Sequence, residues 1–193
     1  GAVKGMAVFD DGSGPALYAG GDFKAAGGVP ANSIAKWDGA NWSTLGSGVS
    51  GGGYAVYALT EFDDGSGPAL YAGGDFATAG GVAANCIAKW DGTSWSALGS
   101  GLSAALLTVH ALTVSGVGGS PALYAGGFFS LAGNVVVSPI GKWDGTTWST
   151  LGNGMDDRVL ALAAFDDGSG TALYAGGVFS SSDGIATNHV AAW

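Results

Sequence analysis

The chain has 193 residues, and its 15 Asp and Glu residues outnumber six Lys and Arg residues, which gives a formal net charge of −9. Six scattered cations cannot form a basic patch, and this argues against binding to nucleic acid or to an anionic membrane surface. No apolar run approaches the roughly 18 residues of a membrane-spanning helix, so the sequence predicts no membrane span.

Glycine is the compositional outlier, with 38 residues, well above a usual share of about 7%. A flexible low-complexity chain would explain this, but 47% of the residues are hydrophobic, and they include seven Trp, eight Phe and six Tyr. A disordered chain lacks such a supply of core-forming side chains, so we interpret the glycines as turn and close-packing positions of a β-protein. Cys86 is the single cysteine, which excludes an intrachain disulfide and leaves the redox compartment open.

The sequence repeats with a period near 50 residues. The dipeptide Leu-Tyr recurs at steps of 53, 53 and 50 residues, at Leu17-Tyr18, Leu70-Tyr71, Leu123-Tyr124 and Leu173-Tyr174. A tryptophan follows at the same steps, at Trp37, Trp90, Trp143 and Trp193. Residues 9–48 and 62–101 differ at only seven of forty aligned positions. The period predicts a propeller-type array with units at about 1–53, 54–106, 107–157 and 158–193.

Each unit is expected to contain four short strands, which the second unit illustrates in chain order. The first strand is AVYALTEF (55–62), and the turn DDGSGP leads back into ALYAGGDF (69–76). A loop rich in Ala and Gly reaches NCIAKW (85–90), and the turn DGTS leads into WSALGSG (95–101). Asp-Gly between strands favours a hairpin, because glycine adopts the positive φ that the turn requires.

The expected fold is therefore an all-β propeller, with about four blades of four antiparallel strands in a single domain over residues 1–193. The fourth unit stops at Trp193, where the other units continue with DG..W..LG, so the fourth blade lacks its last strand. We expect either a section of a longer chain or self-assembly in which a neighbour completes the fourth blade.

These units resemble Kelch-type propeller repeats, in which an apolar stretch ends in Gly-Gly and an aromatic residue followed by Asp precedes a further Trp. In the second unit these are Gly73-Gly74, Trp90-Asp91 and Trp95. The variant YAGGDF…AGG…NSIAKWDG..W..LGSG is similar to repeats of fungal cortical cell-polarity marker proteins and of large secreted or surface-anchored bacterial proteins. The resemblance implies a propeller outside the cell or on its surface, and it implies no catalytic residues.

Calcium is the one cofactor that the sequence suggests. Pairs of aspartates recur in the first hairpin of three units, at Asp10 and Asp11, Asp63 and Asp64, and Asp166 and Asp167. Carboxylates and backbone carbonyls suit this hard cation. The spacing is not that of an EF-hand, however, and the third unit replaces the pair with SGVGGS (115–120). The simpler interpretation is a solvated acidic turn with no metal site.

Three recurring tryptophans are the candidate ligand-binding residues, because exposed indoles stack on sugar rings: Trp42, Trp95 and Trp148. The alternative is that they pack one blade against the next, which suits aromatic residues spaced every 53 positions. A lysine precedes the closing tryptophan in three units, at Lys36, Lys89 and Lys142, and Ala192 takes its place in the fourth. We expect these lysines to be solvated or paired with Asp22 or Asp75.

The sequence predicts no catalytic site. GSGVSG (46–51) fits the GxGxxG pattern but leads into a strand rather than a helix, so it predicts no nucleotide site. His110 and His189 occupy variable positions, where the other units have Lys4, Tyr57 and Leu160, or Ser33, Cys86 and Pro139. Two histidines at different repeat positions and one cysteine supply no convergent cluster for a hydrolase triad or a metal cage. The copper ligands of Kelch-type oxidases likewise have no match.

We therefore expect a non-enzymatic module, extracellular or on the cell surface, with a structural, adhesive or protein-interaction role. Its expected partners are proteins or cell-surface glycans, because near-identical loops on successive blades suit multivalent contact. Two alternatives remain open. One is a carbohydrate-binding, lectin-like propeller, and the other is a subunit of a surface polymer completed by strand exchange between neighbours.

Overall fold

The computed structural model describes residues 1–103, 108–117 and 119–193, and over these residues all the regular secondary structure is β-strand. The strands form four larger antiparallel sheets, one for each sequence unit, and four smaller ones. We number the larger sheets 1 to 4. The expected boundary between the second and third units, at residues 106 and 107, lies outside the described residues, as does position 118 of the SGVGGS segment.

In every larger sheet the strands are hydrogen-bonded in chain order, from the first strand at one edge to the last at the other. Sheet 1 contains β1 (Val3–Asp10), β2 (Pro15–Gly21), β5 (Ile34–Trp37) and β6 (Trp42–Thr44). Sheet 2 contains β8 (Ala55–Asp63), β9 (Pro68–Asp75), β12 (Ile87–Trp90) and β13 (Trp95–Ala97). Sheet 3 contains β15 (Thr108–Ser115), β16 (Ala122–Phe128), β19 (Ile140–Trp143) and β20 (Trp148–Ser149). Sheet 4 contains β21 (Val159–Asp166), β22 (Thr171–Gly177) and β25 (Val190–Ala192).

The smaller sheets are built on a short hairpin between the second and third strands of each unit. These hairpins are β3 (Ala25–Ala26) with β4 (Val29–Pro30), β10 (Thr78–Ala79) with β11 (Val82–Ala83), β17 (Leu131–Ala132) with β18 (Val135–Val136), and β23 (Ser181–Ser182) with β24 (Ile185–Ala186). The segment that ends one unit pairs with the hairpin of the next, as β7 (Val49–Ser50) does with β10 and β14 (Leu102–Ser103) does with β17. Successive units are thus joined by backbone hydrogen bonds.

The predicted all-β class and the antiparallel hairpins are confirmed, with two differences in the second unit. The fourth strand was expected over 95–101 but ends at Ala97, because Gly99 and Gly101 adopt φ values of 61° and 76° that leave the extended region. The loop rich in Ala and Gly contains the β10–β11 hairpin. Each strand of this hairpin has only two residues, which is too short to show a strand pattern in the sequence.

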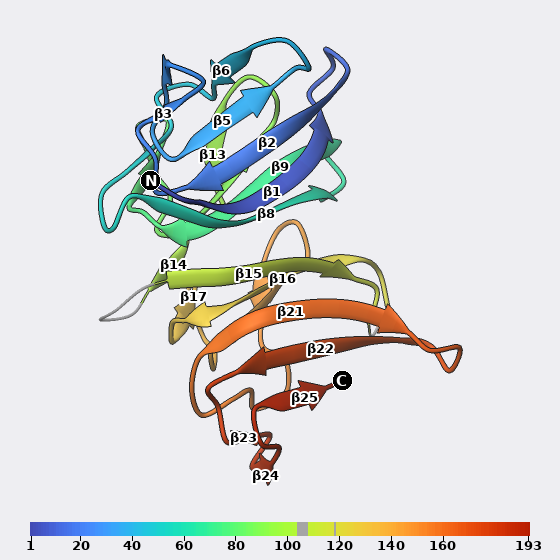
Figure 1. Ribbon diagram of the computed structural model, residues 1–193. Coiled ribbons are helices and arrows are strands. Elements are labelled where there is room, and N and C mark those ends of the chain that lie inside the picture. The colour runs from blue at the N-terminus through green and yellow to red at the C-terminus, as the bar shows by residue number, and fades with distance from the viewer. Residues whose placement is uncertain (104–107, 118) are drawn as a thin grey trace.

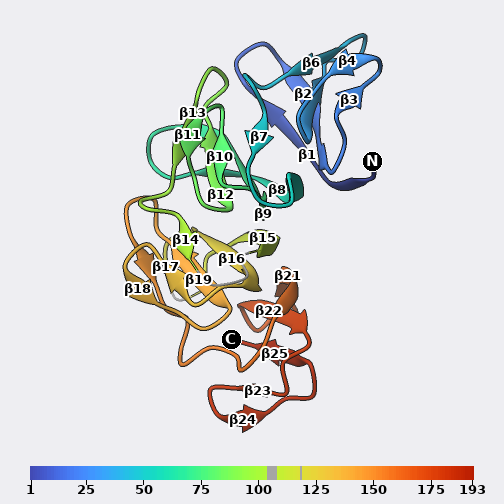
Figure 2. The ribbon, with the colours of Figure 1, turned by 90° about the vertical axis from the view of Figure 1, so that its left-hand side faces the viewer.

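The four larger sheets follow one another in chain order, from sheet 1 in the upper part of the molecule to sheet 4 in the lower part (Figure 1). Seen from the side, they form an arc with the first strands on its inner side and the short hairpins farther out (Figure 2). The first strands pack in series, β1 against β8, β8 against β15 and β15 against β21. One small core cluster, formed by Phe23, Ala31 and Ala35, lies within the first unit. The rest of the described hydrophobic core lies between the sheets, in three clusters that each join two successive units.

A valine-on-glycine contact recurs in each of these clusters. Val56, Val109 and Val159 are fully buried, and each lies against the first glycine of the Gly-Gly pair in the preceding sheet. A Cβ built on Gly73 would lie 2.4 Å from Val109 Cγ1, and Gly20 and Gly126 give 2.5 Å to their own valines. Since real Cβ atoms do not approach so closely, only glycine admits the valine of the next sheet.

Candidate functional site

The acidic hairpins connect the first two strands of sheets 1, 2 and 4. In sheet 1, Asp10 Oδ1 accepts hydrogen bonds from the backbone N–H groups of Gly12 and Gly14, each at 2.9 Å. Asp63 and Asp166 accept the equivalent bonds in sheets 2 and 4. The first aspartate of each pair therefore closes its own turn, as short polar side chains commonly do.

The second aspartate connects the turn to the sheet. Asp64 Oδ1 accepts hydrogen bonds from the backbone N–H and the hydroxyl of Ser66, at 3.1 and 2.6 Å. Its Oδ2 accepts one from Tyr71 Oη at 2.8 Å and one from Lys89 Nζ at 2.6 Å. In sheet 1 the same network joins Asp11 to Ser13, Tyr18 and Lys36.

The expected pairing of the lysines with Asp22 or Asp75 is wrong for Lys36 and Lys89. Lys89 lies directly opposite Tyr71 in the register of β9 and β12, so both side chains share one face and reach the hairpin together. The expectation of a solvated acidic turn is also wrong for the second aspartate, because the side chains of Asp11 and Asp64 are largely buried in these ion pairs.

Burial opposes the negative charge of Asp64, but the hydrogen bonds from Lys89, Ser66 and Tyr71 outweigh it and hold its pKa well below the usual range. Burial, together with the bond to Asp64, raises the pKa of Tyr71 well above its usual value. The Lys89 ammonium already supplies the positive charge beside this carboxylate. Among the residues with described positions, no group of three or more His, Cys, Asp and Glu converges on a metal position. Calcium binding stays a prediction of the sequence.

Trp95 and Trp148 are buried between sheets. Trp95 lies opposite Trp90, with the ring centroids 5.3 Å apart, and its Nε1–H donates a hydrogen bond to the Leu45 carbonyl of the preceding unit at 3.0 Å. Trp148 donates the equivalent bond to Leu98 at 3.1 Å. We therefore correct the sugar-stacking expectation for these two residues, because each indole is enclosed and ties its sheet to the preceding one.

Trp42, in sheet 1, is the exception. Its ring is half-buried, lies 5.4 Å from that of Trp37 and lines a cavity of about 160 Å³ together with Val3 and Phe23. Of the three predicted tryptophans, Trp42 alone keeps a substantially accessible ring.

A second candidate region follows from the β-bulges of the first strands. In β8, Val56 faces Gly74 and Ala58 faces Gly73, so Tyr57 is an extra residue in the ladder. The same irregularity occurs in β1, β15 and β21. The extra residues, which we call the bulge row, are Lys4, Tyr57, His110 and Leu160. β-Bulges re-aim side chains and are frequent near functional sites.

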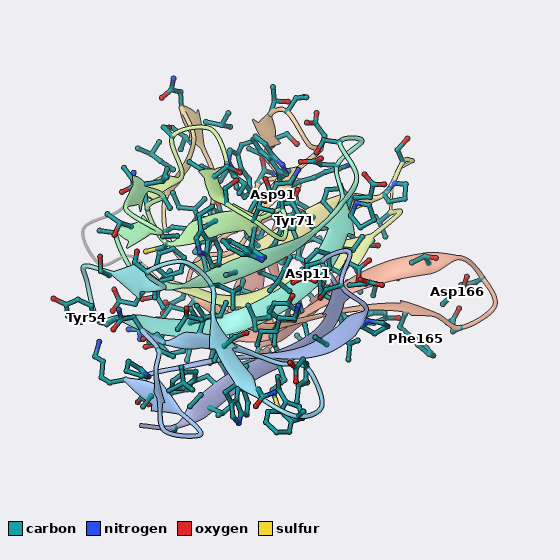
Figure 3. The ribbon with its side chains drawn as sticks, turned by 90° about the horizontal axis from the view of Figure 1, so that it is seen from above. Asp11, Tyr54, Tyr71, Asp91, Phe165 and Asp166 are labelled. Atoms are coloured by element: carbon teal, nitrogen blue, oxygen red, sulfur yellow. The ribbon has the colours of Figure 1, made fainter. Side chains whose placement is uncertain are left out.

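The first three members of the bulge row, in sheets 1 to 3, lie side by side. Lys4 Nζ stands 5.7 Å from the centroid of the Tyr57 ring, and the rings of Tyr57 and His110 lie 5.6 Å apart. Each member is the second or third residue of its first strand, whereas the acidic hairpins begin at the last residue of that strand. In Figure 3, Tyr54, which directly precedes β8, lies on the opposite side of the molecule from the Asp166 hairpin. The row therefore lies at the opposite end of the strands from the acidic hairpins.

The electrostatic environment of the bulge row is mixed. Burial, with the charges of Asp75 and Asp22, raises the pKa of Tyr57. Burial, with the positive charge of Arg158, lowers the pKa of His110, which favours the neutral imidazole. Aromatic faces, a lysine and carboxylates on one surface suit recognition of a polar partner. The row shows no nucleophile activated by a neighbouring base, which nucleophilic catalysis would require.

The other reactive residues of the sequence do not join this row. His189 precedes β25 at the exposed side of sheet 4, at a φ of 75°. Cys86 is buried, and burial raises the pKa of its thiol to about 11, so the thiol rather than the thiolate is present at neutral pH. The GSGVSG segment (46–51) contains the short strand β7 and is followed by β8, in agreement with the expectation that it does not open a helix.

No protein-family model, curated protein or solved structure matches this chain. Within the described parts of the chain, no helix has the length and apolar character needed to cross a bilayer.

Proposed function

We propose that the chain forms a Kelch-like β-propeller, or an arc of one, in which each larger sheet is one blade and sheet 4 is an incomplete blade. The arc of sheets in Figure 2, with the first strands innermost, supports this proposal. The repeated Val-on-Gly and Trp-to-Leu contacts also support it, because they place successive sheets in equivalent arrangements.

We further propose that the module acts without catalysis, outside the cell or on its surface, in a structural, adhesive or protein-interaction role. The observation that carries this proposal is the bulge row. The packing positions repeat almost unchanged from unit to unit, whereas the extra residue of each bulge is a lysine, a tyrosine, a histidine or a leucine. A constant frame that displays different side chains on one surface is suited to recognising a partner.

Carbohydrate binding is the second candidate function, and the same row favours it. Tyr57 and His110 present half-buried rings, and the negative charges of Asp75 and Asp22 help to raise the pKa of Tyr57. Aromatic rings beside hydrogen-bond acceptors are the combination that stacks on a sugar and binds its hydroxyls.

Selection from a displayed peptide library, in parallel with a glycan array, tests both candidates. We expect bound peptides for the protein-interaction role, and Tyr57→Ala to weaken their binding by about tenfold or more, as loss of a central aromatic contact does. Thr60→Ala on the same strand is the matched control and should leave binding unchanged. Retention of glycans in place of peptides would favour the second candidate. Ligands that bind the Tyr57→Ala and His110→Ala variants as tightly as the unchanged chain would contradict a recognition role for the row.

A further inference from the structure

The two ends of the arc expose the two halves of the interface that joins the sheets internally. In sheet 1, Val3 occupies the position of the buried Val56 but is 54% exposed, and Met6 occupies that of Leu59 and is 63% exposed. Among the described residues, no glycine of another sheet lies against Val3. We call this surface the valine face.

Sheet 4 presents the complementary surface. A Cβ built on Gly176 would meet only the His189 carbonyl oxygen, at 4.0 Å, whereas the equivalent Gly73 and Gly126 are filled by valines of the next sheet. Phe165 is 57% exposed, although its counterpart Phe62 is only 5% exposed. We call this surface, which also includes the exposed Val190, the glycine face.

We propose that the valine face of one copy of this chain binds the glycine face of a second copy, in the head-to-tail arrangement that joins sheets within the chain. The internal interfaces support this choice of partner, because the chain forms the same contact three times between sheets of the same kind. Burying exposed apolar surface on both faces supplies the driving force.

A head-to-tail contact is heterologous, so it continues until the assembly closes or grows as a filament. The sheets already curve in one direction (Figure 2), and addition of a second arc in the same sense continues that curve. We therefore expect a small closed ring rather than a filament.

Sedimentation velocity of the 193-residue chain, from low to high micromolar concentration, measures this association. We expect a discrete species larger than the monomer. Met6→Asp on the valine face should weaken association by about tenfold or more, because it buries an unpaired charge in the contact. Gly176→Val on the glycine face should weaken it to a similar extent, because its side chain occupies the space that the valine of the second copy would fill. The matched control is Val136→Asp, at an exposed valine of the small hairpin β17–β18. It should associate as the unchanged chain does.

Mixing the two face variants distinguishes this contact from other kinds of assembly. The Met6→Asp chain keeps its glycine face and the Gly176→Val chain keeps its valine face, so the mixture should form a dimer of one chain of each kind. Circular dichroism at low concentration checks that each variant folds as a monomer.

Three outcomes would overturn the proposal. The first is an unchanged chain that stays monomeric at every concentration. The second is an association that survives both face variants, which would indicate pairing along the open edge of β25 instead. The third is a mixture that forms no dimer of one chain of each kind while one of the two variants still associates with itself, since a symmetric contact through one face would behave in this way.

Discussion

The first two strands of sheet 2 and of sheet 4 are connected by the same hairpin sequence, DDGSG. The two hairpins are nevertheless attached to the rest of the molecule in different ways. The local hydrogen bonds match closely. Gly65 and Gly168 each donate a backbone N–H to the first aspartate at 2.8 Å, and the hydroxyls of Ser66 and Ser169 each lie 2.6 Å from the second. The five-residue sequence alone is therefore sufficient to form the turn.

The difference lies in what meets the second aspartate. In sheet 2, Asp64 also accepts hydrogen bonds from Tyr71 and Lys89, and sheet 3 covers this face. In sheet 4, Ala192 stands where the lysine would be, and Asp167 is exposed to solvent. The turn is therefore specified locally, whereas its attachment requires the third strand and the next sheet.

The largest expected effect tests the contact between sheets. Gly73→Ala should lower the free energy of unfolding by about 3 kcal/mol, because the added Cβ would overlap Val109 Cγ1. Gly176→Ala, at the same position of sheet 4, should change it by no more than about 0.5 kcal/mol. Urea denaturation of dilute protein measures both values. Equal losses at the two glycines would show that backbone freedom, not the valine contact, decides the outcome.

A smaller effect tests the attachment of the hairpin. Lys89→Met should cost about 2 kcal/mol, because it leaves the Asp64 carboxylate largely buried without its cation. Lys142→Met is the matched control in sheet 3, where the ammonium lies 5.8 Å from the Tyr124 ring and the hairpin has no aspartate. It should cost less than about 1 kcal/mol. If both variants lose the same stability, the lysine acts through its aliphatic stem and not through Asp64.

The smallest effect concerns the dependence of stability on pH. The pKa of Asp64 in the folded chain lies below its usual value of 3.8. Its contribution is therefore complete above about pH 4 and is lost as the pH falls toward the folded-state pKa. Asp64→Asn should make the free energy of unfolding fall less steeply between about pH 4 and pH 2 than it does for the unchanged chain. Urea titrations at a series of pH values measure this slope.

Asp167→Asn in sheet 4 is the control for that pH dependence. It should alter the slope less than Asp64→Asn does, because solvent screens the exposed Asp167 carboxylate and Ser169 is its hydrogen-bond partner. Identical slopes for the two variants would contradict the role of the buried network.

The features that could be predicted from the sequence are those set by short-range chemistry. The Leu-Tyr and Trp repeats indicated one antiparallel sheet for each unit, and the Asp-Gly pairs marked the hairpins.

The features that could not be predicted depend on how strands are paired. Lys89 was assigned the wrong partner because its position opposite Tyr71 is a matter of register, which no single strand specifies. Tyr57 and His110 were treated as variable positions without a function for the same reason, since a bulge becomes visible only when two strands are aligned. The sequence offered no clear signal for them, because residues 1–8 and 54–61 also differ at most of the neighbouring positions.

The bulges have a consequence for how such a chain can diversify. The extra residue of each bulge has no partner in the adjacent strand, so it is not constrained by the packing that fixes its neighbours. A substitution at one of these positions therefore alters the displayed surface and leaves the valine-on-glycine packing unchanged; the positions are Lys4, Tyr57, His110 and Leu160. Copying a unit adds one more independently adjustable position. The same architecture could therefore acquire a new specificity through single mutations without having to re-evolve its core.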